Sequence, residues 1–277
     1  MRRLLGILFL VSALCACDRI PEGTHSQSTQ SLLIAGSSTM LPLAKTLVEA
    51  FLQGRRDVSA TCSGGGSTAG IVALRRGTID VALLSRDVRG KEDAPGLRCL
   101  PYARNAVGFT VHPSNPLSDI SIDQMRAVLV GDVADWMAVG GKAGNIRVIS
   151  RKSGSTTLQS VDDLILHGED LTDAAEPVAS ATELMSMVAD DPRAVGFVSY
   201  ADLGHCPADL RSRIKILTVN QAPMQRETIL SGRYPLTRVL HFAILEERTP
   251  AVQAFLDFIL SPHGRKITME HGLLPVR

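Results

Sequence analysis

Aromatic residues are scarce in this 277-residue chain, and neither sign of charge is in excess. Phe, Trp and Tyr make up 4% of the sequence, and 29 Lys and Arg residues stand against 28 Asp and Glu residues. A net charge of +1 argues against a nucleic-acid-binding protein or another polyanion binder, because such proteins usually show a clear basic excess. Hydrophobic residues reach 45%, so most of the chain is expected to form a globular core rather than a disordered segment.

The spacings typical of metal sites are also missing. The sequence contains no CxxC or HxxxH pattern, and its seven histidines are scattered. We therefore expect no metal site and no cofactor. The body of the chain holds three cysteines, Cys62, Cys99 and Cys206. An odd number leaves one unpaired in any case, and the sequence leaves open whether two of them form a disulfide or all three are small buried apolar residues.

The one marked apolar run lies at the amino terminus. Two arginines precede the ten apolar residues 4–13, and Leu14-Cys15-Ala16-Cys17 follows them. Ten residues are too few for a membrane-spanning helix but suit a secretory signal peptide. The last four residues resemble a bacterial lipobox, so residues 1–17 are expected to be a lipoprotein signal peptide with Cys17 as the lipidated residue. The alternative is ordinary cleavage near Ala16 without a lipid.

Residues 18–30 are polar and rich in turn formers, which predicts a flexible tether between the membrane and the folded part. No second apolar stretch is long enough to span a bilayer. The expected location is extracytoplasmic, in the periplasm or at the cell surface, with a lipid anchor on Cys17.

Short apolar runs alternate with helical periodicity along the rest of the chain. This repetition of βα units predicts an α/β fold with mainly parallel sheets. The expected strands are 32–35, 58–62, 80–84, 107–111, 146–150, 194–200, 214–219 and 240–245, and the expected helices start at Pro42 and cover 69–76, 158–166, 251–260 and 264–271.

Three of the expected strands end in loops rich in small hydroxyl residues, and a helix follows each loop. The loops are GSST (36–39), SGGGST (63–68) and SGSTT (153–157). Any one of them could simply cap its helix, because Ser and Thr are good N-cap residues. In open α/β sheets, however, such strand ends share one edge, where ligands bind. Helix N-termini and hydroxyl donors together suit a small oxyanion, and Arg151 at the third loop adds a cation.

From about Leu32 to its end, the chain resembles the phosphate-binding protein of bacterial ABC-type phosphate importers. The matching segments follow one another in the usual order: AGSSTMLPLAKTLVEAF (35–51), SGGGSTAGIVALRRGTIDVALLSRDV (63–88), NPLSDISIDQMRAVLVGDVADWMAVGG (115–141), RKSGSTT (151–157), AVGFVSYADLG (194–204), YPLTR (234–238) and AFLDFILSPHGRKITMEHGLLPV (254–276).

The resemblance implies a type II periplasmic-binding-protein-like fold, in which two α/β lobes joined by hinge crossovers close over the anion. The expected lobes are residues 31–105 with 236–277, and residues 106–235. The implied function is capture of inorganic phosphate by a monomer and its delivery to the membrane permease of an ABC importer, without catalysis.

The family's binding residues carry over onto the hydroxyl loops and Arg151. The implied phosphate ligands are Ser38, Thr39, Met40, Ser67, Ser85, Arg151, Ser155, Thr156 and Thr157. Two of these positions depart from the family pattern. Thr156 stands where Gly is usual, and Ser85 stands where some members have an Asp that accepts a hydrogen bond from protonated phosphate and repels sulfate. A hydroxyl lacks that repulsion, so selectivity for phosphate over sulfate or arsenate stays open. Arg86, next to Ser85, is expected to be a solvated rim residue rather than a second cation of the site.

Other functions remain as alternatives. Gly64-x-Gly66-x-x-Ala69 fits a dinucleotide fingerprint, but Asp80 and Asp87 fall at the wrong places for the ribose contact. Residues 65–69 loosely resemble a nucleophile elbow, so a secreted serine hydrolase that uses Ser67 is the enzyme alternative. A sensor of phosphate, or a binder of another tetrahedral oxyanion, would share the fold with the transport protein.

Overall fold

The computed structural model describes residues 30–276, and the predicted signal peptide, Cys17 and most of the predicted tether lie outside the described residues. Gln30, the last residue of the expected tether, already belongs to the first strand. The strands are β1 (Gln30–Gly36), β2 (Val58–Ser63), β3 (Val81–Leu84), β4 (Leu97–Val111), β5 (Asp119–Ile120), β6 (Arg147–Arg151), β7 (Glu176–Val178), β8 (Ala194–Ser199), β9 (Lys215–Ile216), β10 (Thr218–Val219), β11 (Thr237–Leu245) and β12 (Leu274–Pro275).

Ten α-helices and three shorter helical segments connect these strands within residues 30–276. The α-helices are α1 (Leu41–Leu52), α2 (Ser67–Arg75), α3 (Ile122–Val130), α4 (Thr156–Val161), α5 (Ala181–Asp190), α6 (Tyr200–Gly204), α7 (Ala208–Arg211), α8 (Arg226–Leu230), α9 (Pro250–Leu260) and α10 (Pro262–Glu270). The short segments are η1 (Gly90–Glu92), η2 (Trp136–Val139) and η3 (Asp162–Leu166), of which η3 is a π-helix. None of the helices in this part of the chain is both long and apolar enough to cross a membrane.

One mixed sheet runs through the molecule in the order β2-β1-β3-β11-β4-β8-β6-β7. Its outer strands pair in parallel, as the βα pattern predicts: β1 with β2 and β3, and β6 with β7 and β8. The middle of the sheet differs from the mainly parallel arrangement expected, because β11 is antiparallel to β3 and β4, and β4 is antiparallel to β8. The fold is therefore an α/β fold with two long antiparallel strands at its centre.

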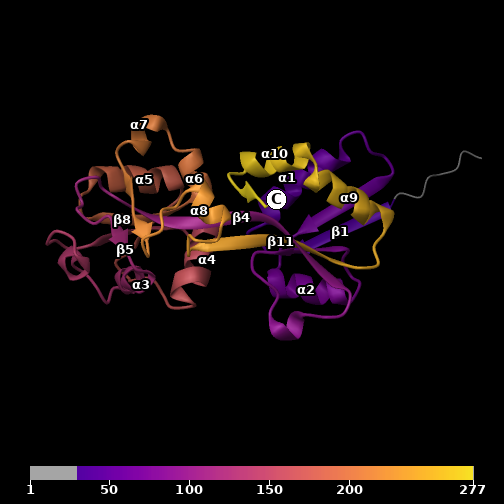
Figure 1. The fold of residues 1–277 in the computed structure, drawn as a ribbon, viewed down its shortest axis with the longest axis horizontal. Helices are drawn as coiled ribbons and strands as arrows, with labels where there is room; N and C mark the ends of the chain where they lie inside the picture. The colour runs from indigo at the N-terminus through magenta and orange to yellow at the C-terminus, as the bar shows by residue number, and fades with distance from the viewer. Residues whose placement is uncertain (1–29, 277) are drawn as a thin grey trace, which may run out of the picture.

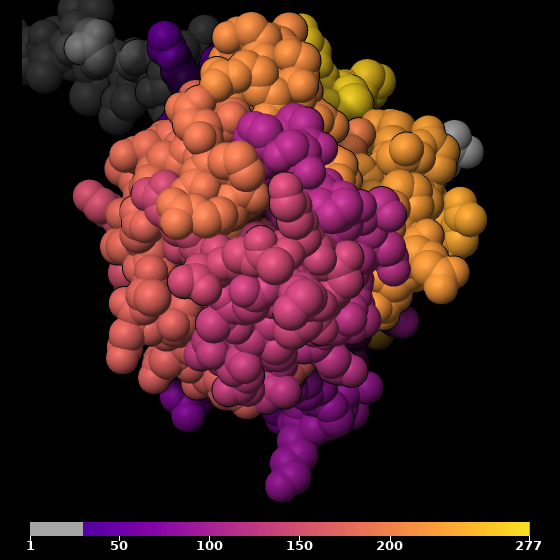
Figure 2. Space-filling view, turned by 90° about the vertical axis from the view of Figure 1, so that its left-hand side faces the viewer, coloured from indigo at the N-terminus to yellow at the C-terminus, as the bar shows by residue number. Residues whose placement is uncertain are grey.

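Those two strands join two separately packed halves (Figure 1). The core of one half takes buried side chains from residues 32–103 and 240–267, and we call this half the first lobe. The core of the other takes residues 106–236 and Leu274, and we call it the second lobe. Residues near 120–170 cover the outer end of the second lobe, which faces the viewer in Figure 2. Strand β4 spans both lobes, since its first part pairs with β11 and its last five residues pair with β8.

The first lobe brings its strand ends close together at Gly36. This residue has φ +140°, and a Cβ on it would lie 2.4 Å from the carbonyl oxygen of Leu83. Ser37 N–H donates to that carbonyl at 2.8 Å, and Gly66 N–H donates to the Gly36 carbonyl at 2.9 Å. Only glycine allows this approach, which places the loops after β1, β2 and β3 side by side.

Candidate functional site

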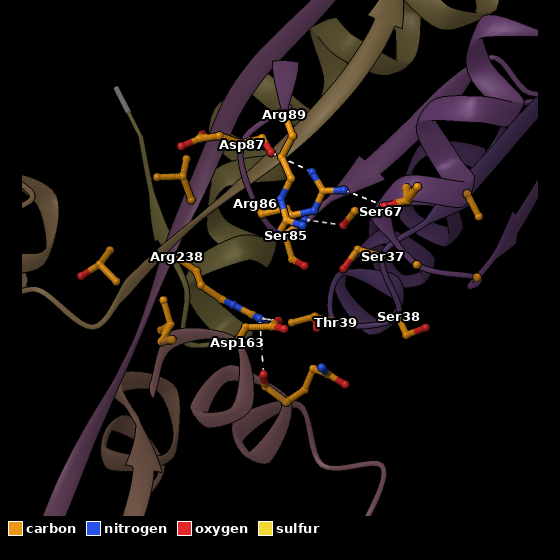
Figure 3. Close-up of a pocket in the computed structure, with 18 residues that line it drawn as sticks. Ser37, Ser38, Thr39, Ser67, Ser85, Arg86, Asp87, Arg89, Asp163 and Arg238 are labelled. Carbon is orange, nitrogen blue, oxygen red and sulfur yellow. Dashed lines mark hydrogen bonds and ion pairs between the residues drawn. The ribbon is translucent and has the colours of Figure 1, made fainter. Parts of the chain in front are cut away.

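The converging loops of the first lobe line a hollow of about 510 Å³ that also reaches β11 and the second lobe. Its size is within the usual range for small-molecule sites. Its lining includes four of the predicted ligands, Ser38, Thr39, Ser67 and Ser85, as well as Ser37, Arg86, Gln159, Asp163 and Arg238. Figure 3 shows the serines on one side of the hollow and Arg238 with Asp163 on the other, with Thr39 between the two groups.

The hydroxyls of the first two loops are not used as helix caps. Helix α1 is capped by Met40 and helix α2 by Gly66, and neither cap has a side-chain hydrogen bond. The Oγ of Ser67 instead accepts a hydrogen bond from the Ser85 N–H at 3.2 Å, which ties the start of α2 to the end of β3. The alternative that these loops only cap their helices is therefore wrong for the first two loops. The hydroxyls of Ser38, Thr39 and Ser67 line the hollow instead.

The third loop behaves differently. Ser155 caps α4, because its Oγ accepts a hydrogen bond from the Leu158 N–H at 3.4 Å. Arg151, at the end of β6, donates from Nη2 to the carbonyl of Ala179 at 3.3 Å, and its buried Nε has no hydrogen-bond partner within the described residues. Thr157 is buried and donates to Asp202 at 3.3 Å.

The structure thus brings four of the nine predicted ligands to the hollow. Met40 is fully buried in the core of the first lobe, and only its backbone could serve a ligand at the start of α1. Arg151, Ser155, Thr156 and Thr157 are not among the residues that line the hollow; Ser155 lines a neighbouring hollow of about 420 Å³ instead. Gln159 on α4 lines both hollows, so the two are adjacent. The ligand role of all nine residues stays a prediction.

Arg86 is not the solvated rim residue that the sequence analysis expects. Both of its Nη atoms donate to the carboxylate of Glu92, each at 2.7 Å, and Nη2 also donates to the Thr68 hydroxyl at 2.7 Å. These bonds lower the pKa of Glu92 to about 2 and raise the pKa of Arg86. Because Glu92 neutralises it, Arg86 adds little net charge to the hollow.

Arg238 is a lining residue whose importance sequence reasoning missed. Its side chain is only 4% exposed, forms an ion pair with Asp163, and donates from Nη2 to the carbonyl of Gln159 at 3.4 Å. Burial lowers the pKa of Arg238 to about 10, so the guanidinium keeps its charge at neutral pH. The sequence offered no signal for this pair, since its members lie 75 positions apart, one on β11 and the other in η3.

His241 lies on β11, three residues after Arg238. It is 7% exposed, and its Nε2 is 3.3 Å from the Asp87 carboxylate. Burial lowers its pKa in spite of Asp87, so the folded protein binds this proton less well than the unfolded chain, whose histidine pKa is about 6.5. The contribution of His241 to the free energy of unfolding is therefore fully present above the pKa of the unfolded chain. It is lost as the pH falls from there through the lowered pKa of the folded protein.

We expect the protein to be less stable to urea at pH 5.5 than at pH 7.5, and His241→Gln to reduce that difference. Unfolding followed by fluorescence at both pH values measures it. His263→Gln, which changes an exposed histidine, is the control and should leave the difference unchanged. Part of the difference will remain, because burial also lowers the pKa of His271. An unchanged pH dependence in His241→Gln would contradict the assignment.

Cys62, Cys99 and Cys206 are all free and partly buried. Of the two alternatives that the sequence leaves open, a disulfide or unpaired cysteines, the described residues show unpaired cysteines. Among residues 30–276, no group of three or more His, Cys, Asp or Glu side chains is placed to hold a metal ion.

Comparison with known proteins identifies the family of the chain. Residues 22–263 match the family described as the PBP superfamily domain. The phosphate-binding protein PstS of Borreliella burgdorferi is 25% identical over the full length of both chains, and PstS of Bacillus subtilis is 25% identical over 99% of this chain and 92% of its own.

Solved structures give the same result. The crystal structure of PstS from Borrelia burgdorferi superposes with a TM-score of 0.78 at 25% identity, covering 90% of this chain and 99% of that one. An ABC-type phosphate transport receptor from Vibrio cholerae has the same fold, with a TM-score of 0.76 at 24% identity over 88% of this chain and 99% of that one. The chain belongs to the PBP superfamily, the periplasmic-binding-protein family.

Proposed function

We propose that this chain is the substrate-binding component of an ABC importer and captures inorganic phosphate between its two lobes. The observation that carries the proposal is the hollow at the strand ends of the first lobe, where the hydroxyls of Ser38, Thr39, Ser67 and Ser85 gather. Helix α2 begins at this hollow, and its unpaired N–H groups and positive dipole end favour an anion. The relatives named as phosphate-binding proteins support phosphate as the anion.

Closure of the lobes is part of the proposal. The hollow is much larger than a tetrahedral oxyanion, so the first lobe alone would leave the ligand largely in water. The 151–157 loop lies close to the hollow, because Gln159 on the following helix lines it. Movement of the lobes about β4 and β11 would bring this loop onto the ligand. Only that closed state would complete the hydrogen bonds of the anion, which is why binding would stabilise it. The lobes would be residues 31–105 with 236–277, and residues 106–235, with the side chains of Leu236 and Leu274 packed into the core of the second lobe.

The proposed setting is extracytoplasmic. Residues 1–17 would direct export, and a lipid on Cys17 would keep the protein at the membrane, where it would act as a monomer beside the permease. Binding is favoured over hydrolysis because a serine nucleophile needs an adjacent general base, most often a histidine, and the buried His241 on β11 pairs with Asp87 instead.

Calorimetric titration of the full chain in mild detergent with phosphate, sulfate, arsenate and molybdate tests the proposal. We expect phosphate to bind with a dissociation constant in the micromolar range or below, about −8 kcal/mol or better. Sulfate binding of equal strength would show that Ser85 does not discriminate between the two anions. A folded protein that binds none of the four anions would contradict the proposed function.

Ser67→Ala should weaken phosphate binding by about 0.5–1.5 kcal/mol, because it removes one hydroxyl donor from the hollow. Ser59→Ala is the control, since Ser59 is an exposed residue on the neighbouring strand β2. The same calorimetric titration measures both variants. An affinity of Ser67→Ala equal to that of the parent protein would remove Ser67 from the set of ligands.

A further inference from the structure

Arg238 occupies the crossing between the two lobes. The neighbouring residue Leu236 is in the core of the second lobe, and Leu240 is in the core of the first. From this position on β11 the guanidinium reaches toward Asp163 in the second lobe, and it lines the same hollow as the first-lobe hydroxyls (Figure 3). The ion pair therefore joins the hinge strand to the second lobe at the wall of the proposed binding site.

The hydrogen bonding of this buried guanidinium is incomplete. Nη2 contacts Asp163 and, at 3.4 Å, the carbonyl of Gln159, whereas the buried Nη1 has no hydrogen-bond partner within the described residues. An arginine presents its N–H groups as a planar fork that fits two oxygens of a carboxylate or of a phosphate. A tetrahedral oxyanion could therefore take the place of the carboxylate and engage more of the fork.

The other charged side chains around the hollow are less suited to meet an anion. Arg86 is held by both oxygens of Glu92, and Arg89 is exposed. The partner of Arg238 is easier to displace, because the Asp163 side chain is 48% exposed and can turn to water. Asp163 also lies in the π-helical turn η3, and such turns are frequent at functional sites.

We propose that Arg238 is a ligand of the bound anion, and that the Asp163 carboxylate holds the anion's place on the guanidinium until the anion replaces it. This inference rests on the proposed function and adds a binding residue to it. Exchange keeps the buried guanidinium paired at every stage, which matters because an unpaired buried charge is costly. It also couples binding to the hinge, since the departing carboxylate ends the ion pair between Asp163 and the hinge strand β11.

Phosphate titration of four full-length proteins in mild detergent tests the exchange. Arg238→Gln should weaken phosphate binding at least tenfold, because it removes the cation. Asp163→Asn should tighten phosphate binding several-fold, because it removes the competing carboxylate. Arg98→Gln is the matched control: Arg98 lies on β4, pairs with the exposed Glu246 after β11, and is remote from the hollow. Its affinity should stay within twofold of the parent protein.

The double variant separates ligation from a purely structural tie between the lobes. In the Asp163→Asn background, Arg238→Gln should still weaken binding at least tenfold. No further loss in that background would show that Arg238 acts only through Asp163 and would overturn the proposal. Weaker phosphate binding by Asp163→Asn alone would overturn it as well, because the carboxylate would then help the anion rather than compete with it.

Melting curves show whether each variant is folded. If Arg238→Gln does not fold, Arg238→Lys replaces it, and this variant should weaken binding less than tenfold because it keeps the charge but loses the fork. A parent protein that is folded but binds no phosphate defeats the proposed function, and with it this inference. A parent protein that binds phosphate, with both Arg238 variants unaffected, defeats the inference alone.

Discussion

Phe242→Ala should destabilise the protein by about 3–5 kcal/mol, the usual cost of removing a large buried aromatic side chain. Phe242 is fully buried on β11, and its ring packs edge-to-face against Tyr102 at 4.9 Å and Phe255 at 6.0 Å between centroids. These rings connect the central strands β4 and β11 to helix α9. The core of the first lobe therefore has a single aromatic centre, and its loss leaves a cavity that the surrounding strands cannot fill.

Thermal unfolding followed by circular dichroism measures this effect. For a chain of this size each kcal/mol corresponds to about 2–4 °C, so the melting temperature should fall by roughly 6–20 °C. Met137→Ala is the control, because Met137 is 68% exposed on the second lobe, and it should change the stability by less than about 0.5 kcal/mol. A loss below about 1 kcal/mol in Phe242→Ala would show that the first lobe is not organised around this ring.

The periodicity of the sequence located most of the outer strands and five of the ten α-helices to within a few residues, because each of these is a local pattern, whereas α3, α5, α6, α7 and α8 were not predicted. Strand β4 shows where this fails. Only residues 107–111 form an apolar run, whereas the strand begins at Leu97 and passes Arg98, Pro101 and Arg104. Pro101 is tolerated because the register with β11 shifts between Leu240 and His241, opposite this proline. The partner strand lies more than 130 residues away, so no local pattern could predict the antiparallel centre of the sheet.

The segment 158–166 gives a second example. Its apolar spacing predicts one helix, and the structure divides it into the end of α4 and the π-helical turn η3. A π-helical turn holds more residues than an α-helical turn, and Asp163 lies in this turn and lines the hollow. The hydroxyl loops, in contrast, were identifiable from sequence because each lies directly after a strand. The Arg238–Asp163 pair was not identifiable: Arg238 ends the YPLTR segment, but Asp163 lies in none of the matching segments, and only the tertiary fold brings the two together.

Arg151→Ala should weaken phosphate binding by about 1.5–3 kcal/mol, the range for a hydrogen bond to a charged group. The guanidinium has spare donors, since only Nη2 is engaged, with the Ala179 carbonyl, and the buried Nε has no partner among the described residues. If closure brings the 151–157 loop onto the anion, these donors meet oxygens that the first lobe leaves in water. The loss should therefore be specific to anion binding and leave the melting temperature nearly unchanged.

Lys152→Ala separates contact from long-range attraction. Lys152 is exposed and adjacent to Arg151, so it carries the same charge to nearly the same place on a solvated side chain. Titrations at low and at moderate salt should show that the effect of Lys152→Ala fades with added salt, because exposed charges are screened, whereas the loss in Arg151→Ala persists. Equal losses of phosphate affinity in the two variants, both absent at moderate salt, would mean that the second lobe attracts the anion only by long-range electrostatics.

The anion would then be held by the first lobe and the hinge alone. It would not bridge the lobes, and closure could not depend on Arg151.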